Sequence, residues 1–267
     1  MVEKNLRLQK ITSDEAERLT LARLLDQREK ALRRNIPTAT NFLTPREQEL
    51  AKELLTSMGA LEEGIFRGGY EGAERQIALF LPDYLDEKLY EEDEEFPICA
   101  VRCHYRVEDR PTHRDFLGSL MGLGIRREMV GDLLVSEGSC DLLLRREIRD
   151  FVLQNYVSSG RTHVKTEAIP LAHLHLPEQQ RQEIVGTVAA LRLDSVVAVA
   201  FRLSRTKAAE QIRSGRVEVN WRPCEKGDHT CAEGDRITVR GLGKCTLKEI
   251  GGLSKKGRIT IRAERYR

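Results

Sequence analysis

The chain has 267 residues, of which 40% are hydrophobic and 32% are charged. This composition predicts a soluble protein with two or three modest cores and is too polar for a membrane protein. The amino terminus lacks the apolar stretch of a signal peptide, and the longest aliphatic run, Val196–Phe201, is far shorter than the roughly 20 residues that span a bilayer. We therefore expect a cytoplasmic protein that makes no membrane contact.

The charge is distributed unevenly along the chain. Residues 192–267 hold 18 Lys and Arg against 9 Asp and Glu, a net charge of +9, whereas the preceding residues hold 26 against 33, a net charge of −7. A basic segment of this kind attracts polyanions, above all the phosphates of nucleic acids. A solvated basic surface without a ligand is the alternative that this observation leaves open.

The cysteines and histidines do not predict a metal site. The six cysteines are too sparse for a disulfide scaffold and are expected to be mostly buried apolar residues. Cys224, His229 and Cys231 lack the spacing of a zinc site and a clear fourth ligand, and His173 and His175 have no carboxylate or cysteine at ligand spacing. We expect no metal and no cofactor.

Residues 1–72 are predicted to form a helical N-terminal domain. From Thr12 to about Asn35, apolar residues recur at helical spacing, with Thr12 or Ser13 as the N-cap. A second helix is expected to begin after Thr44-Pro45 and to end near Gly59, because Pro suits the first helical position. The predicted inward residues are Ala16, Leu19, Ala22, Leu25 and Leu32 in the first helix and Leu50, Leu54 and Leu55 in the second.

Residues 73–179 are predicted to form a ferredoxin-like central domain. After the strand of residues 75–82, the pattern from Pro97 is strand, helix, two strands, helix and strand, which is βαββαβ. Helices cover one face of such a sheet, and alternation predicts a basic opposite face. Its residues would be Arg102, His104, Arg106, His163 and Lys165. We expect either a secondary RNA surface or a scaffold, because RNA recognition motifs carry aromatic residues in the third strand and residues 139–145 have none.

Residues 180–267 are predicted to form a small basic domain. Leu193, Val196, Val197 and Ala200 form one helix face, and Ser204 can cap a second helix that packs Ala208, Ala209 and Ile212 inward. Gly215 ends this helix, and strands follow at Val217–Val219 and Ile237–Val239. Guanidinium groups bind phosphates bidentately, and a helix N-terminus adds amide donors. We predict a rim around Arg205, Lys207, Arg213 and Arg216, with Ser204, Gln211 and Asn220 as neutral neighbours.

These residues resemble the ribosomal-protein-S-four-like (S-four) RNA-binding domain. The matching positions are Arg192-Leu193-Asp194, Ser204 to Ala208, Ile212, Gly215-Arg216-Val217, Val219-Asn220, Gly234-Asp235 and Val239-Arg240-Gly241. The chain departs from the pattern at Asn220-Trp221, where Asn-Gly is usual. With the resemblance, the predicted RNA-binding set is Arg192, Ser204, Arg205, Thr206, Lys207, Gln211, Arg213, Arg216, Asn220 and Arg240.

Over nearly its full length the chain resembles the YlmH family of bacterial S-four proteins. The family combines a helical N-terminal unit, a ferredoxin-like domain and an S-four domain, so the expected fold class is α+β. The resemblance implies a non-catalytic factor that binds ribosomal RNA and tRNA on large ribosomal subunits carrying a stalled peptidyl-tRNA, in ribosome-associated quality control. The implied partners are the large subunit, its RNA, tRNA and other quality-control factors, and we expect a monomer.

Two other classes of function stay open. The first is an RNA-modifying enzyme of the pseudouridine synthase or rRNA methyltransferase type, because Arg192-Leu193-Asp194 is similar to the surroundings of a catalytic aspartate in some pseudouridine synthases. Asp194 opens a predicted helix, however, where a carboxylate stabilises the first turn. The second is a DNA-binding helix-turn-helix regulator. Strands that continue the basic helix pair favour recognition of structured RNA instead.

Overall fold

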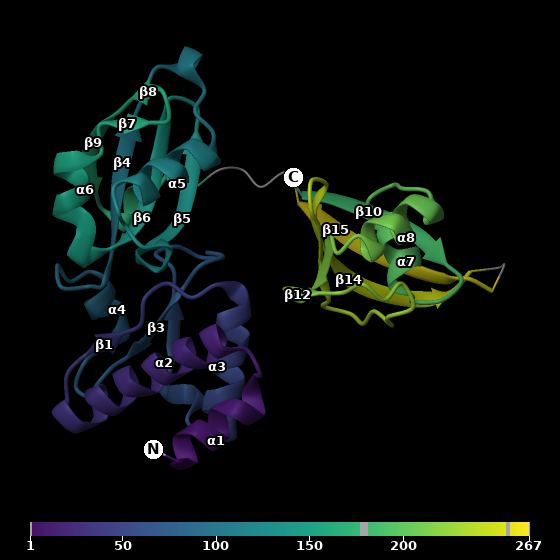
Figure 1. Ribbon diagram of the computed structural model, residues 1–267, viewed down its shortest axis with the longest axis horizontal. Coiled ribbons are helices and arrows are strands. Elements are labelled where there is room, and N and C mark those ends of the chain that lie inside the picture. Colours follow the sequence, from purple (N-terminus) through teal and green to yellow (C-terminus); the bar gives the residue numbers. More distant parts are fainter. Residues whose placement is uncertain (1, 177–180, 255–256, 267) are drawn as a thin grey trace. The chain divides into compact units, whose positions relative to one another are not determined.

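The computed structural model describes residues 2–176, 181–254 and 257–266, with side chains from residue 5 onward. The chain divides into two compact units, residues 1–177 and 178–267 (Figure 1). The predicted domain boundary between residues 179 and 180 lies outside the described residues. In the described part of the chain, no helix is both long and apolar enough to cross a membrane.

The N-terminal part of the first unit combines helices with a small sheet of order β1-β3-β2. The predicted boundary between residues 72 and 73 falls inside the hairpin of β2 and β3, so residues 77–80 belong with the N-terminal sheet. The elements are α1 (Val2–Ile11), α2 (Glu15–Arg34), β1 (Thr38–Ala39), α3 (Pro45–Ser57), β2 (Ile65–Arg67) and β3 (Ile77–Phe80).

Helix α2 forms where it was predicted but buries a different face. Its N-cap is Asp14, whose side chain accepts a hydrogen bond from the backbone N–H of Glu17, and not Thr12 or Ser13. The structure buries Leu21, Leu24 and Ala31 against α3 and β3. Of the predicted inward residues, Ala22 and Leu25 are partly buried against this core, while Ala16, Leu19 and Leu32 are exposed. Leucines lie on two neighbouring faces of this helix, and packing against the other elements selects one of them.

Helix α3 agrees with its prediction at both ends. The Thr44 side chain accepts a hydrogen bond from the backbone N–H of Glu47, whose carboxylate accepts one from the backbone of Thr44, and Pro45 occupies the first turn. The predicted residues Leu50, Leu54 and Leu55 are completely buried.

The central part of the first unit follows the predicted βαββαβ order, except that a short hairpin, β7–β8, stands between its second helix and its last strand. Its four-stranded antiparallel sheet has the order β5-β6-β4-β9, so the first strand pairs with the third and the last. Helices α5 and α6 cover one face, where Cys99, Val101 and Cys103 are buried against Phe116 and Val152. The elements are α4 (Glu87–Glu91), β4 (Ile98–His104), α5 (His113–Gly122), β5 (Val130–Ser136), β6 (Ser139–Arg145), α6 (Arg149–Asn155), β7 (Ser158–Ser159), β8 (Thr162–His163) and β9 (Lys165–Ile169).

The opposite face of this sheet is only partly open. Ile98, Ala100 and Leu143 on this face are buried in one cluster with Phe42 and Leu79 of the N-terminal part. The two parts share this core, which explains why residues 1–177 form one compact unit.

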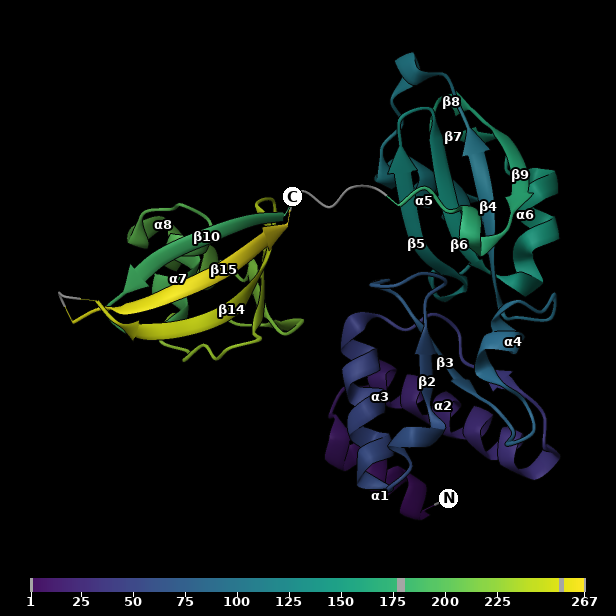
Figure 2. The ribbon, with the colours of Figure 1, turned by 180° about the vertical axis from the view of Figure 1, so that it is seen from behind.

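The second unit places two helices on one face of a six-stranded antiparallel sheet of order β10-β15-β14-β13-β11-β12. Figures 1 and 2 view it from opposite sides and show α7 and α8 over one face, with strands β10, β15 and β14 uncovered on the other. The elements are β10 (Arg181–Val188), α7 (Leu193–Ala200), α8 (Arg205–Arg213), β11 (Val217–Val219), β12 (Arg222–Pro223), β13 (Arg236–Val239), β14 (Gly243–Leu253) and β15 (Ile259–Tyr266).

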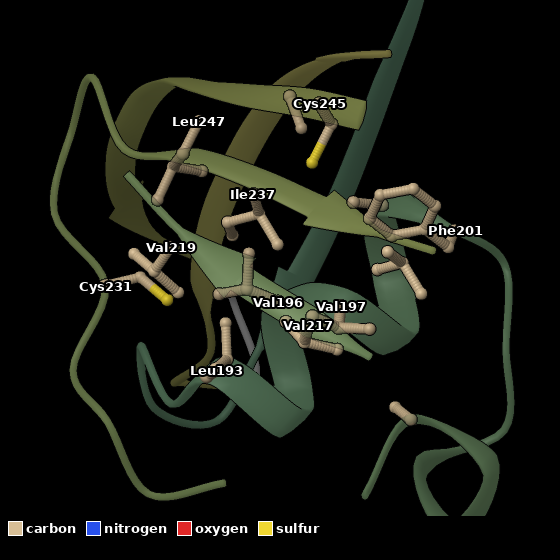
Figure 3. Close-up of a cluster of buried hydrophobic side chains, with 14 of the residues drawn as sticks. Leu193, Val196, Val197, Phe201, Val217, Val219, Cys231, Ile237, Cys245 and Leu247 are labelled. Atoms are coloured by element: carbon tan, nitrogen blue, oxygen red, sulfur yellow. The ribbon is translucent and has the colours of Figure 1, made fainter. Parts of the chain in front are cut away.

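The core of the second unit lies between the helices and the sheet. Figure 3 shows Val196 and Val197 of α7 beside Val217 and Ile237 of the sheet, all completely buried. The close approach of β10 to α7 depends on Gly186, because a Cβ atom there would lie 2.5 Å from a methyl carbon of Val199. This packing fixes the rotation of both helices and hence the direction of their polar side chains.

Candidate nucleic-acid interface

The start of α7 holds a carboxylate that joins two arginines. Asp194 is 9% exposed, and its oxygens lie 3.3 Å from Nε and Nη2 of Arg192 and 3.0 Å from the Ser195 hydroxyl. Arg205, at the start of α8, places Nη2 3.5 Å from the same carboxylate. Arg192 and Arg205, which are 13 positions apart in the chain, are thereby held side by side.

The carboxyl of Asp194 is ionised at neutral pH. Burial alone would raise its pKa, but the hydrogen bonds from Arg192 and Ser195 and the positive charges of Arg205 and Arg192 outweigh it, so the pKa lies below its ordinary value. The two guanidinium groups stay largely open to solvent, with 45% and 61% of their side chains exposed. Asp194 therefore orients cations that keep donors for another anion.

Helix α8 directs its first turn outward. The Ser204 hydroxyl accepts a hydrogen bond from the backbone N–H of Lys207 at 3.2 Å, as the sequence predicted. Because Ala208 and Ile212 are completely buried, Arg205, Thr206 and Lys207 face solvent. The positive end of the helix adds to their charge. We call Arg192, Arg205 and Lys207 the α8-start group.

A second set of arginines lies at the other end of α8. Arg213 is in its last turn, and Arg216 follows Gly215, whose φ of 66° is left-handed. The backbone of Arg216 accepts a hydrogen bond from Arg240 N at 2.9 Å and donates one to Gln211 O at 3.1 Å. Arg213, Arg216 and Arg240 are exposed, and we call them the α8-end group. Gln211 is half-buried beside them.

The predicted single rim is thus two groups. The nine residues of α8, at 1.5 Å per residue, separate them by about 13 Å. Asn220 belongs to neither, because it follows the opposite end of β11 from Arg216. Its side chain donates to Asp235 Oδ1 at 2.8 Å and accepts from Arg236 N at 2.9 Å, so its polar atoms hold two loops together.

The predicted basic face of the central sheet is largely neutralised by its own acids. Arg102 makes a bidentate pair with Asp141, at 2.7 and 2.8 Å, and only 11% of the Arg102 side chain and none of Asp141 is exposed. His104 Nε2 lies 2.8 Å from the Glu167 carboxylate. The two strand neighbours of β4 therefore supply the partners of its basic residues.

The remaining predicted residues of this face are exposed but dispersed. Arg106 lies 3.3 Å from Asp109, His163 is in the separate β7–β8 hairpin, and Lys165 begins β9. A secondary RNA surface here stays a prediction, and its net charge is smaller than the sequence indicated.

Sequence reasoning missed a stack of three side chains on the open face of the second sheet. The guanidinium carbon of Arg236 lies 5.5 Å from the ring centroid of Trp221 and 5.9 Å from that of Tyr266. The available signal was the chain's one tryptophan at a turn position where glycine is usual.

Five of the six cysteines are buried in the cores of the two units, as predicted, and Cys224 is partly buried. Burial raises the pKa of the Cys231 thiol to about 12, so it stays protonated at neutral pH. Among the described residues, no group of three or more His, Cys, Asp or Glu lies close enough together to hold a metal ion.

Three family models match successive parts of the chain. The N-terminal model of YlmH matches residues 16–85, the model of an RNA-binding domain in YlmH matches residues 91–173, and the S4 domain matches residues 191–237. The S4 match contains the α8-start group, Arg213 and Arg216.

Two individual proteins are also similar to this chain. The "Ribosome-associated protein quality control protein P2" of Bacillus subtilis is 35% identical over 230 residues, which cover 85% of this chain and 87% of that protein. A solved structure titled "Cell division protein ylmH from Streptococcus pneumoniae" is 23% identical with a TM-score of 0.47 and covers 60% of this chain and 95% of that chain. From the three successive models and the Bacillus relative, the chain belongs to the YlmH family, and it is a homologue of a ribosome-associated quality-control protein with RNA-binding domains.

Proposed function

We propose that this protein is a non-catalytic RNA-binding factor of the cytoplasm that binds ribosomal RNA and tRNA on the large ribosomal subunit. It would act where a stalled peptidyl-tRNA remains on the subunit, together with other quality-control factors. The observation that carries the proposal is the pair of exposed basic groups at the two ends of α8. The name of the Bacillus relative supports the ribosomal setting.

The two groups suit an RNA backbone. Each offers guanidinium groups, which bind phosphate oxygens bidentately, and the helix N-terminus between Arg205 and Lys207 offers a positive dipole end. A separation of about 13 Å, the length of α8, lets the groups contact different phosphates of one strand or the two strands across a groove. Rigid basic groups at fixed spacing recognise the shape of structured RNA.

The surroundings of Asp194 support a non-catalytic role. An RNA-modifying enzyme of the pseudouridine synthase type would use this aspartate, yet its oxygens are bonded to Arg192 and Ser195 and lie beside Arg205. A carboxylate held in this way positions cations.

The proposal is tested by neutralising the α8-start group. Arg205→Gln with Lys207→Gln is preferred to charge reversal, because a glutamate at position 205 would face the buried carboxylate of Asp194. We expect affinity for purified large subunits to fall about ten-fold at moderate salt. The slope of log affinity against log salt should be reduced by about 1 for each phosphate that the variant no longer neutralises.

A matched control removes two charges elsewhere. Lys30→Gln with Arg33→Gln changes exposed residues of α2 and lowers the net charge equally. Equal affinity loss in both double variants would mean that net charge alone drives binding, and an unchanged affinity of the α8 variant would refute the proposed site.

Crosslinking in cells identifies the RNA. Sequenced fragments from large-subunit RNA and tRNA would support the proposal, whereas fragments from messenger RNA or the small subunit would contradict it.

A further inference from the structure

The turn between β11 and β12 contains a residue that its backbone disfavours. Val219 pairs with Arg222, so Asn220 and Trp221 form a two-residue hairpin turn, with φ values of 50° and 60°. Left-handed φ at both central positions is the type I′ turn, for which Asn-Gly is the preferred sequence. Asn220 fits this preference, whereas a bulky side chain at the second position is strained.

Strained backbone positions are retained mainly where they serve a function. Here the strain is not offset by packing in the core: in the described part of the chain, Trp221 is neither in the buried cluster of the second unit nor among the side chains packed against it. Its ring is half-buried and lies over Arg236.

Arg236 and Tyr266 support the ring from one side. Residues that alternate with the buried Ile237 and Ala263 face away from the core, which places Arg236 and Tyr266 on the sheet face opposite α7 and α8. The guanidinium carbon of Arg236 lies over both rings, 5.5 Å from the Trp221 centroid and 5.9 Å from the Tyr266 centroid. Its buried Nε has no hydrogen-bond partner among the described residues, so the aromatic rings are its main contacts.

The side chains around this stack are polar or charged. Arg222, next to Trp221, is exposed. The Thr246 hydroxyl lies 3.4 Å from the Tyr266 hydroxyl, which donates to Glu264, and Lys248 neutralises that carboxylate at 3.2 Å. A flat π surface with cations and hydroxyls at its edge matches an unpaired nucleotide, whose base stacks while its phosphate meets a cation.

We propose that Trp221, supported by Arg236 and Tyr266, is a stacking site for an unpaired RNA base. The stack lies on the face of the second unit opposite the helices, so this unit would contact RNA with both faces. The inference rests on the proposed function only in taking RNA as the partner. The net charge of +9 over residues 192–267 favours RNA over an apolar protein surface.

The single tryptophan gives a direct test in the full-length protein. We expect the Trp221 emission to be quenched by a short single-stranded oligoribonucleotide and to change little when the same oligonucleotide is annealed to its complement. Emission that stays constant while saturating single-stranded RNA binds would overturn the proposal, as would quenching by the duplex alone.

Substitutions separate binding from folding. Trp221→Gly suits the turn, so we expect an equal or higher urea midpoint together with at least about five-fold weaker binding of labelled single-stranded RNA and unchanged binding of the duplex. Trp221→Phe keeps a ring and should retain most of the affinity. Unchanged single-strand affinity in Trp221→Gly, or a lower urea midpoint with equal loss for both RNAs, would reduce Trp221 to a structural residue and refute the site.

The α8-start variant distinguishes the two proposals. Loss of duplex and subunit binding in Arg205→Gln/Lys207→Gln, with no effect of Trp221→Gly, would refute the stacking site and leave the proposed function intact. Weaker binding of single-stranded RNA in Trp221→Gly, with no effect of Arg205→Gln/Lys207→Gln on duplex or subunit binding, would refute the α8-start group and leave the stacking site intact.

Discussion

Arg102 of the central sheet and Arg205 of the second unit both lie beside an aspartate, yet the two pairs differ in kind. Arg102 makes two short bonds to a completely buried carboxylate, and the carbonyl of His173 accepts a further bond from Nη2. Arg205 approaches its aspartate at 3.5 Å and is 61% exposed. The first pair consumes the donors of its arginine, and the second leaves most of them available.

A count of basic residues alone therefore overestimates the capacity of a surface to bind RNA phosphates. The central sheet offers less free basic surface than its sequence pattern indicated, because the neighbouring strands supply Asp141 and Glu167 as partners of Arg102 and His104. What matters for binding a phosphate is the number of donors that the fold leaves free.

The largest effect is expected from Arg102→Ala. It leaves the buried Asp141 side chain without its guanidinium partner and with the backbone N–H of His175 as a remaining donor at 2.8 Å, so the free energy of unfolding of the first unit should fall by about 3 kcal/mol. Urea denaturation followed by far-ultraviolet circular dichroism measures this, and affinity of the folded protein for large subunits should be unchanged.

A double variant sharpens this result. Arg102→Met with Asp141→Leu removes both charges and should recover much of the lost stability. If Arg102→Ala left stability intact and weakened RNA binding, Arg102 would belong with Arg205, and the two arginines would not differ in kind.

A smaller effect is expected at the other aspartate. Asp194→Ala removes the bonds from Arg192 and Ser195 and the ion pair with Arg205, so the free energy of unfolding of the second unit should fall by about 2 kcal/mol at pH 7. Fluorescence of Trp221 during urea denaturation reports on this unit.

The difference in the free energy of unfolding between wild type and Asp194→Ala depends on pH, because the pKa of Asp194 is lowered in the folded protein. Burial opposes the lowering, but the bonds from Arg192 and Ser195 and the charge of Arg205 outweigh burial, so the unfolded chain binds the proton more tightly. The stabilisation is fully present above the ordinary pKa of about 3.9 and is lost as the pH falls through the lower native value. If the difference in the free energy of unfolding between variant and wild type increased on acidification, this explanation would be wrong.

The smallest effect concerns the start of α8. Ser204→Ala removes the cap of α8, the helix that carries Arg205, Lys207 and Arg213, and should cost about 1 kcal/mol, measured as a shift of the urea midpoint. Ser204→Asp keeps an acceptor and is the matched control. At the start of α5 in the first unit, the side chain of Asp115 accepts an additional hydrogen bond from the backbone N–H of Thr112. Loss of one capping side chain should therefore matter more at Ser204 than at the start of α5.

Local signals were sufficient to predict most elements. Alternation placed Arg102 and His104 on the face of β4 opposite the helices, and Ser204 and Gly215 marked the ends of α8, because caps and periodicity act over a few residues. Arg205 and Lys207 were predicted for the same reason, whereas Arg192 was added by the resemblance to the S-four domain.

Features that depend on distant residues were not predicted. The Arg102–Asp141 pair joins positions 39 apart, and only the strand register brings them together. The inward face of α2 was misassigned because its packing partners, not its own sequence, choose between two leucine faces. Trp221 stacks with Arg236 and Tyr266 from two other strands, an arrangement that no local pattern indicates.

The position of β10 has a consequence for how the second unit is made. Among the described strands it pairs with β15 alone, and the hydrogen bond between Thr187 and Arg258 spans 71 positions. During synthesis β10 emerges first and stays unpaired until the last strand of the unit follows, so the sheet closes in one late step of high contact order. The helix pair that carries the basic groups can form early, but its supporting sheet is complete only when residues 259–266 have joined it.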